Sequence, residues 1–122
     1  MLEYPVANLE DSDFDSQGNI INSEALQYPV VVVMAQSSWC PHCTNAKPAF
    51  QEFANKYGNK ILVATIQADG ERPSEKALGK RIASLIPGFR GFPEYALFKN
   101  GKFVTSKIKG RGVSDLEEFM KM

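Results

Sequence analysis

The chain is poor in cysteine and histidine and has no apolar stretch of membrane length. Only two cysteines and one histidine occur among its 122 residues, which is too few cysteines for the several disulfides of a small secreted scaffold. The longest apolar run, Val30 to Ala35, is far too short to cross a bilayer. The N-terminus also lacks the basic-then-apolar pattern of a signal peptide. If Met1 is the natural start, we expect a cytoplasmic protein without a membrane segment.

Basic residues are missing from the first third of the chain. All 14 Lys and Arg residues lie from Lys47 onward, whereas residues 1–46 carry six acidic residues. The totals nevertheless balance at 14 basic and 14 acidic residues, so no overall charge attracts nucleic acid or anionic lipid. We interpret the acidic segment as a solvated surface, and steering of a partner by this segment is the alternative.

The length allows one domain with its own core but not two. We therefore predict a single domain over residues 1–122. Residues 1–28 form its acidic N-terminal segment, in which we expect a short strand and a loop or one-turn helix. We also expect a monomer.

The first half of the chain predicts a strand, a helix and a second strand. The β-branched run after Pro29 is typical of a strand buried on both faces. From Thr44 to Tyr57 apolar residues recur every three or four positions, which predicts an amphipathic helix that contains Pro48 and ends at a glycine. Residues 61–68 read as a second buried strand, so the two strands should lie parallel.

The second half predicts a helix, a hairpin and a final helix. Pro73 can begin a helix that ends at Pro87-Gly88. Residues 95–98 and 102–108 read as strands, joined by the strong hairpin signal Asn100-Gly101. Ser114-Asp115-Leu116-Glu117 resembles a capping box that opens a short helix. The sum is an α/β domain with a parallel half and a hairpin half.

The chemistry is concentrated in the run Trp39-Cys40-Pro41-His42-Cys43, between the first buried strand and the amphipathic helix. Cys40 therefore stands at a helix N-terminus, where free N–H groups and the helix dipole favour an anion. The thiolate is the reactive form of cysteine, and such positions promote it. A protonated His42 would add a positive charge and weaken the disulfide relative to the dithiol.

This arrangement predicts a thiol–disulfide oxidoreductase that needs no cofactor and acts on protein disulfides or dithiols. We expect Cys40 to be the exposed nucleophile. Cys43, one helical turn further in, should be buried and resolve the mixed disulfide. Trp39 should cover the site and contact the substrate, and a partly buried core aromatic is an equally open reading of Trp39.

Two other classes of function remain open. Cys40, His42 and Cys43 offer three zinc ligands, but a structural zinc site takes four, and three ligands within four residues suit tetrahedral geometry poorly. We therefore predict no metal. The second alternative is a protein-binding module whose cysteines are incidental to docking.

Several further features resemble the thioredoxin superfamily over nearly the whole chain. Pro48 matches the proline of its active-site helix, and Gly110 falls where the family has a glycine after the last strand. Residues 88–93 (Gly-Phe-Arg-Gly-Phe-Pro) look like the segment that leads to the family's cis-proline, and residues 98–102 resemble the hairpin that follows.

The resemblance implies the thioredoxin fold, a central mixed β-sheet flanked by helices on both faces. It also implies that Pro93 is cis and faces the sulfurs, so that the backbone of Phe92 can pair with an extended substrate. On this basis Trp39, Phe92 and Pro93 are the expected substrate-binding residues, and Trp39, Pro41, His42 and Pro93 tune or support the cysteines. A reductase or the glutathione pool is the expected redox partner.

The chain also departs from the family pattern. Met34 stands where thioredoxins have a buried Asp, and Thr65 where they have the Lys that pairs with it, so the internal base for Cys43 is missing. Glu94 replaces the usual Thr after the cis-proline, which would place a carboxylate near the sulfurs.

The direction of electron flow stays open. The dipeptide Pro41-His42 is the one found in bacterial periplasmic disulfide oxidases, and His at this position also occurs in protein disulfide isomerases, which indicates an oxidising poise. A reducing cytoplasm favours a reductase instead, and this is the direction we narrowly favour.

Overall fold

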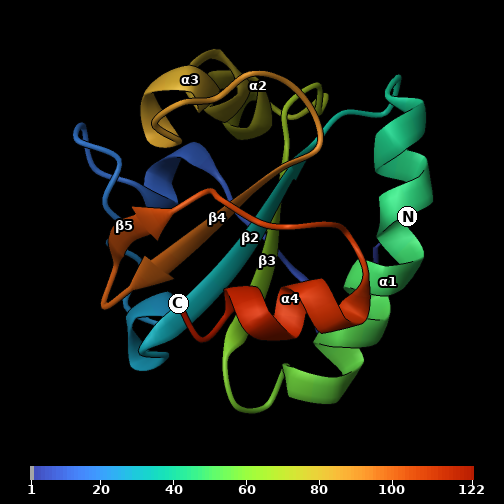
Figure 1. Ribbon diagram of the computed structural model, residues 1–122. Helices are drawn as coiled ribbons and strands as arrows, with labels where there is room; N and C mark the ends of the chain where they lie inside the picture. Colours follow the sequence, from blue (N-terminus) through green and yellow to red (C-terminus); the bar gives the residue numbers. More distant parts are fainter. Residues whose placement is uncertain (1) are drawn as a thin grey trace.

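The strand that precedes the cysteines is the most deeply buried part of the chain. In β2 (Val30–Gln36) every residue after the first is buried. The computed structural model describes residues 2–122 and places β2 at the centre of a five-stranded sheet of order β1-β3-β2-β4-β5 (Figure 1). A β-branched run suits this position because its side chains pack on both faces of the sheet.

The other elements follow the predicted order closely. Around β2 the chain forms β1 (Ala7–Asn8), the short 3₁₀ turns η1 (Asp11–Asp13) and η2 (Ala25–Gln27), α1 (Pro41–Tyr57), β3 (Leu62–Gln67), α2 (Pro73–Lys80), α3 (Ile82–Leu85), β4 (Glu94–Lys99), β5 (Lys102–Thr105) and α4 (Val113–Phe119).

The sheet is mixed, as predicted. β1 and β2 both pair in parallel with β3, whereas β4 runs antiparallel to β2 and β5 antiparallel to β4. The hairpin between β4 and β5 turns at Asn100 and Gly101, whose φ angles of 52° and 82° belong to the tight turn that Asn-Gly favours.

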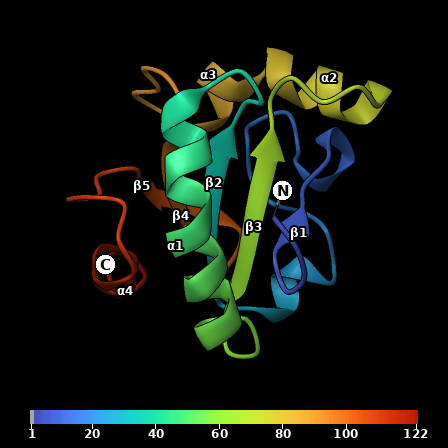
Figure 2. The same ribbon diagram turned by 90° about the vertical axis from the view of Figure 1, so that its right-hand side faces the viewer.

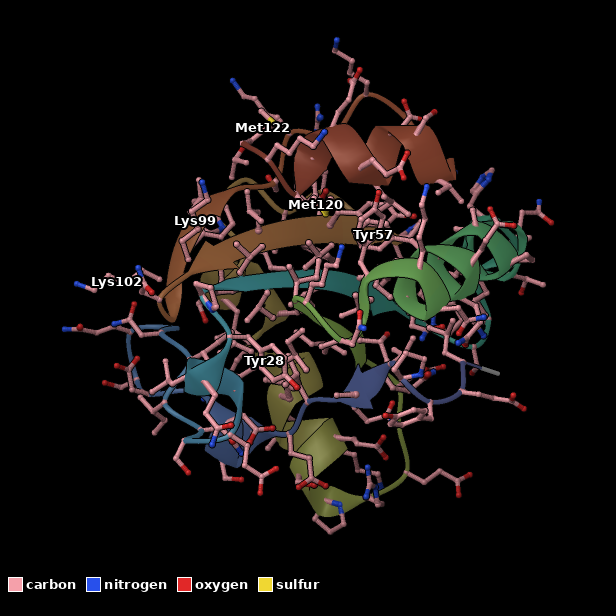
Figure 3. The ribbon with its side chains drawn as sticks, turned by 90° about the horizontal axis from the view of Figure 1, so that it is seen from below. Tyr28, Tyr57, Lys99, Lys102, Met120 and Met122 are labelled. Carbon is pink, nitrogen blue, oxygen red and sulfur yellow. The ribbon has the colours of Figure 1, made fainter. Side chains whose placement is uncertain are left out.

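Helices cover both faces of this sheet. Figure 2 shows α1 running across the front of β2 and β3, and α1 and α4 pack on the cluster that contains Met34, Phe50 and Tyr95. Viewed from below, α2, α3 and residues 9–28 lie on the opposite side of the sheet (Figure 3). They close a second cluster around Phe14, Leu78 and neighbouring core residues. The α/β fold with helices on both faces is confirmed.

The helix predicted from Pro73 to the Pro87-Gly88 pair is divided into α2 and α3. Arg81 lies between them, where its N–H bonds to Leu78 O at 3.0 Å, a tighter step than an α-helical turn. Its guanidinium reaches 2.8 Å from Asp11. Just before the break, a Cβ on Gly79 would lie 2.1 Å from the carbonyl oxygen of Ala68. Close packing on the end of β3 and the anchored Arg81 therefore interrupt a helix that periodicity alone would continue.

Two predicted boundaries in the last third of the chain are wrong. β5 ends at Thr105 rather than at residue 108, because the Thr105 hydroxyl accepts a bond from the N–H of Lys107 at 3.0 Å and the chain leaves the sheet. The last helix begins at Val113, with Gly112 as its N-cap. The Gly112 N–H bonds to the Asp115 carboxylate at 3.1 Å, so Ser114 does not cap this helix.

The acidic N-terminal segment is not simply a solvated surface. Glu10 lies 3.2 Å from Arg72, and Asp11 pairs with Arg81 across the start of α2 and α3. Part of the charge asymmetry along the sequence is thus neutralised in the fold.

Within residues 2–122, no helix has the length and apolarity that a membrane crossing requires.

Candidate active site

The two cysteines occupy the first turn of α1. Cys40 is the N-cap residue of this helix and Pro41 its first helical residue. The Sγ of Cys40 accepts a hydrogen bond from the backbone N–H of Cys43 at 3.2 Å, and both cysteines are free thiols. The Cys40 side chain thus caps the helix. The free N–H groups at the helix N-terminus point at its sulfur and favour a negative charge there.

The structure corrects the expected exposure of Cys40. Its exposed fraction is only 3%, and that of Cys43 is 0%. Cys40 is buried because the segment before β4 covers its sulfur. The Cys40 thiol donates a hydrogen bond to the carbonyl oxygen of Phe92 in this segment at 3.4 Å. The Phe92–Pro93 peptide bond is cis in the structure. Cys40 is therefore sheltered beneath the segment that was expected to receive the substrate.

The aromatic residue before the cysteines lies at the surface. Trp39 is 70% exposed, and its ring meets that of Phe92 edge to face at a centroid separation of 6.0 Å. The reading of Trp39 as a partly buried core aromatic is therefore wrong. Pro41 and His42 are also exposed, so the residues between the cysteines face solvent while the sulfurs do not.

Burial sets the acidity of the inner cysteine. Removal from water, followed by its hydrogen bond with Cys40, raises the pKa of Cys43 from 9.0 to about 11. A buried thiolate loses its hydration, so the neutral thiol is favoured. Cys43 is therefore a thiol in the neutral pH range and needs a proton acceptor before it can act as a nucleophile.

This acidity can be measured in a Cys40→Ser variant, where Cys43 is the only thiol. With a Cys40→Ser/Cys43→Ser variant subtracted to remove the tyrosinate signal, we expect thiolate absorbance at 240 nm to rise well above pH 9 in the folded protein and near pH 9 in urea. Because the folded pKa is the higher one, Cys43 contributes to stability below about pH 9 and this contribution is lost as the pH rises toward about 11. A folded-state midpoint at or below 9 would contradict the effect of burial.

Two of the three departures from the family pattern lie side by side. Met34 and Thr65 are register partners in β2 and β3. The Thr65 hydroxyl donates to the Met34 carbonyl oxygen at 2.8 Å and accepts from the Gln36 side-chain amide at 2.8 Å. Hydrogen bonds between uncharged groups thus occupy the place where thioredoxins have a buried Asp–Lys pair.

Tyr95 is a site residue that sequence reasoning missed. It is 2% exposed, its hydroxyl has no hydrogen-bond partner within the described residues, and burial raises the pKa of this phenol to about 12. The register pairs Tyr95 with Met34, on the face covered by α1. Strand periodicity could have revealed it, since Tyr95 stands two residues after Pro93 and faces the same side as Met34.

The unpartnered hydroxyl of Tyr95 should cost stability. A Tyr95→Phe variant removes a desolvated group without opening a cavity, so we expect the free energy of unfolding to rise by about 1 kcal/mol. Tyr57→Phe is the matched control, because the Tyr57 hydroxyl donates to Glu117 at 2.5 Å where α1 approaches α4 (Figure 3). The control should lower stability. Urea denaturation of the reduced proteins measures both, and a loss of stability in Tyr95→Phe would show that its hydroxyl has a partner in solution.

The loop before the cysteines has an anchor that the sequence analysis also missed. The carboxylate of Asp69 accepts the backbone N–H of Ser38 at 3.0 Å. Burial alone would raise the pKa of Asp69, but hydrogen bonds from Ser38 and Gln67 lower it. Asp69 follows β3 and Ser38 follows β2. Their proximity could have been expected, because parallel neighbouring strands end at the same edge of a sheet.

Glu94 does not face the cysteine side of the sheet. It pairs in register with Ala35, whose side chain belongs to the cluster under α2 and α3. The Glu94 carboxylate, which was expected near the sulfurs, therefore lies on the opposite face of the sheet.

Within residues 2–122, no three His, Cys, Asp or Glu side chains form a group suited to a metal ion.

A C-x-x-C dithiol at a helix N-terminus, on a mixed sheet with helices on both faces, defines the class of thioredoxin-fold proteins, whose chemistry is thiol–disulfide exchange. The family model for thioredoxin matches residues 5–122. The chain belongs to the thioredoxin family.

Individual relatives agree with this assignment. A thioredoxin-like protein, 453L, of Invertebrate iridescent virus 6 is 41% identical over 112 residues, which cover 83% of this chain and 80% of the viral protein. Thioredoxin Asp f 28 of Aspergillus fumigatus is 31% identical over 91 residues, 75% of each chain. Among solved structures, the zinc-bound form of human ERp44 matches 95% of this chain and 30% of its own, with a TM-score of 0.68 and 18% identity. The last likeness concerns the fold alone.

Proposed function

We propose that this protein exchanges disulfides with protein substrates through Cys40 and Cys43, with Cys40 as nucleophile and Cys43 as resolving thiol. The observation that carries the proposal is the bond from the Cys43 N–H to the Cys40 sulfur at 3.2 Å, at the N-terminus of α1. This geometry supports negative charge on Cys40. The raised pKa of Cys43 keeps the second thiol protonated, and therefore unreactive, during the first attack.

The proposed reduction proceeds in two balanced steps. The Cys40 thiolate attacks one sulfur of the substrate disulfide, and the other sulfur leaves as a thiolate that takes up a proton. Cys43 then loses its proton and attacks the Cys40 sulfur, which releases the second substrate thiol. Two electrons pass to the substrate, and a Cys40–Cys43 disulfide remains for a reductase or the glutathione pool to reduce.

The surface around the sulfurs supports the proposed roles of the flanking residues. The exposed Trp39 and the half-buried Phe92 form an aromatic edge beside Cys40, where an extended substrate segment can pack. Pro93 shapes the backbone opposite the sulfurs. His42 is exposed next to Cys43, so a protonated imidazole would favour the dithiol form. Reduction as the direction, the cytoplasmic location and the monomeric state stay predictions.

A redox titration against glutathione buffers tests this proposal. The dithiol is followed by Trp39 fluorescence and by counting alkylated thiols on a gel. We expect a single two-electron transition. A potential near about −270 mV is that of a reductase, whereas a value between about −180 and −120 mV would assign the protein to disulfide formation or isomerisation. If the thiol count does not change across the buffers, the cysteines are incidental and the protein is a binding module.

A further inference from the structure

A groove opens directly beside the segment that shelters Cys40. It is lined by residues 87–88 and 90–95, which lead into and begin β4, and by residues 106–111, which connect β5 to α4. Figure 1 shows the second of these segments crossing in front of the sheet before it reaches α4. The volume of the groove is about 930 Å³. Phe92 belongs to its lining, and the carbonyl oxygen of Phe92 accepts the hydrogen bond of the Cys40 thiol, so one residue of the groove is in direct contact with the reactive sulfur.

Positive charge lines this groove. Arg90, Lys107, Lys109 and Arg111 all contribute to its wall and are exposed, and Glu94 is the single acidic residue of the lining. Lys109 lies 3.7 Å from a carboxylate of α4. Among residues 2–122 the other three cations have no acidic partner within salt-bridge distance.

Two acidic residues of the N-terminal segment are paired away from this groove. On the far side of the sheet, Arg72 pairs with Glu10 at 3.2 Å and Arg81 with Asp11 at 2.8 Å. Glu10 and Asp11 are therefore held beside α2 and Arg81, away from the β5–α4 connection. The balanced total charge of the sequence conceals a local excess of positive charge next to Cys40.

We propose that this groove binds an acidic stretch of the substrate protein next to the disulfide that Cys40 attacks. The inference rests on the proposed function and deepens it by naming the class of substrate. Carboxylates of an extended segment would pair with Arg90, Lys107 and Arg111 while its backbone follows residues 92–93. Complementary charge accelerates encounter and excludes basic competitors.

Two matched peptides test the inference. Both carry the same intramolecular disulfide, and they differ only in three flanking residues, Glu in one and Gln in the other. At low salt we expect kcat/KM to be about five- to tenfold higher for the acidic peptide, the factor that two exposed ion pairs supply. In about 1 M NaCl the Debye length is about 3 Å, and the preference should fall to about one.

Charge variants locate the preference. Arg90→Gln combined with Arg111→Gln should remove most of it and leave turnover of the neutral peptide unchanged. Lys60→Gln combined with Lys76→Gln is the matched control, because these exposed residues change the net charge equally and do not line the groove. The control should keep the preference.

The outcomes separate this inference from the proposed function. Equal kcat/KM for the two peptides at low salt, with both turned over, overturns the acidic-substrate inference and leaves the oxidoreductase intact. A preference that survives in the Arg90/Arg111 double variant, or that is lost equally in the control, overturns the assignment to this groove. Faster turnover of a glutathione mixed disulfide than of the acidic peptide also overturns it, because the groove would then serve a small anion. Failure of both peptides refutes the proposed function itself.

Discussion

Replacing Cys40 by serine should abolish disulfide exchange, with turnover of a protein disulfide falling to the level of the buffer blank. Only a thiolate attacks a disulfide sulfur, and a serine hydroxyl stays protonated and inert under these conditions. Cys43 cannot take over, because it is completely buried and burial raises its pKa to about 11. Turnover is measured by the turbidity that develops when a model protein of two disulfide-linked chains is reduced, with a dithiol as the electron donor.

The matching Cys43→Ser variant should behave differently. Here the first attack proceeds, but no second thiol displaces the substrate, so a covalent mixed disulfide between Cys40 and the substrate accumulates. Non-reducing electrophoresis followed by mass spectrometry identifies the linked sulfur. The same adduct should be missing from Cys40→Ser. An adduct on Cys43 in that variant would reverse the proposed roles, and partner binding without any adduct in either variant would favour the binding module.

The second large effect concerns the packing that holds α1 on the sheet. A Phe50→Ala variant should lose about 3–5 kcal/mol of unfolding free energy, because truncation of a buried aromatic removes transfer energy and leaves a cavity. Phe50 is 0% exposed, and its ring lies 6.2 Å from that of Tyr95 in β4. Since domains of this kind have only about 5–15 kcal/mol in total, the site should melt with the fold well below the wild-type temperature.

Urea denaturation of the reduced protein measures this loss. Val104→Ala is the control, because Val104 lies in β5 with 42% of its surface exposed, and its replacement should cost less than about 1 kcal/mol. Similar losses in the two variants would mean that the cluster under α1 is loosely packed. Addition of benzene to Phe50→Ala probes the expected cavity, since an apolar cavity of this kind can take up small apolar molecules.

Where local chemistry and periodicity agreed, the sequence predicted the fold well. The run of valines required burial on both faces, and Asn100-Gly101 supplied the positive φ angles that the hairpin needs. The predictions that were wrong depend on contacts distant in sequence. The break between α2 and α3 follows from Gly79 packing on Ala68 and from the pairing of Arg81 with the N-terminal segment, which no local pattern reports.

The same distinction applies to the site. The spacing of Cys40 and Cys43 placed one sulfur at the helix cap and the other inside the helix, as the structure has them. The burial of Cys40 was missed because it depends on a segment 52 positions further along the chain. Strand periodicity could have placed Tyr95 on the Met34 side of the sheet, but nothing about an aromatic residue in a strand indicates that its hydroxyl lacks a partner among residues 2–122.

Both margins of the sheet are unusually short. The outermost strands, β1 and β5, comprise two and four residues, and β5 begins at the exposed Lys102, which projects from the hairpin together with Lys99 (Figure 3). A brief, charged margin gives a foreign strand little backbone to extend. If this protein exchanges disulfides with partly unfolded chains, as proposed, it offers them few free backbone groups from which an amyloid-like sheet could grow.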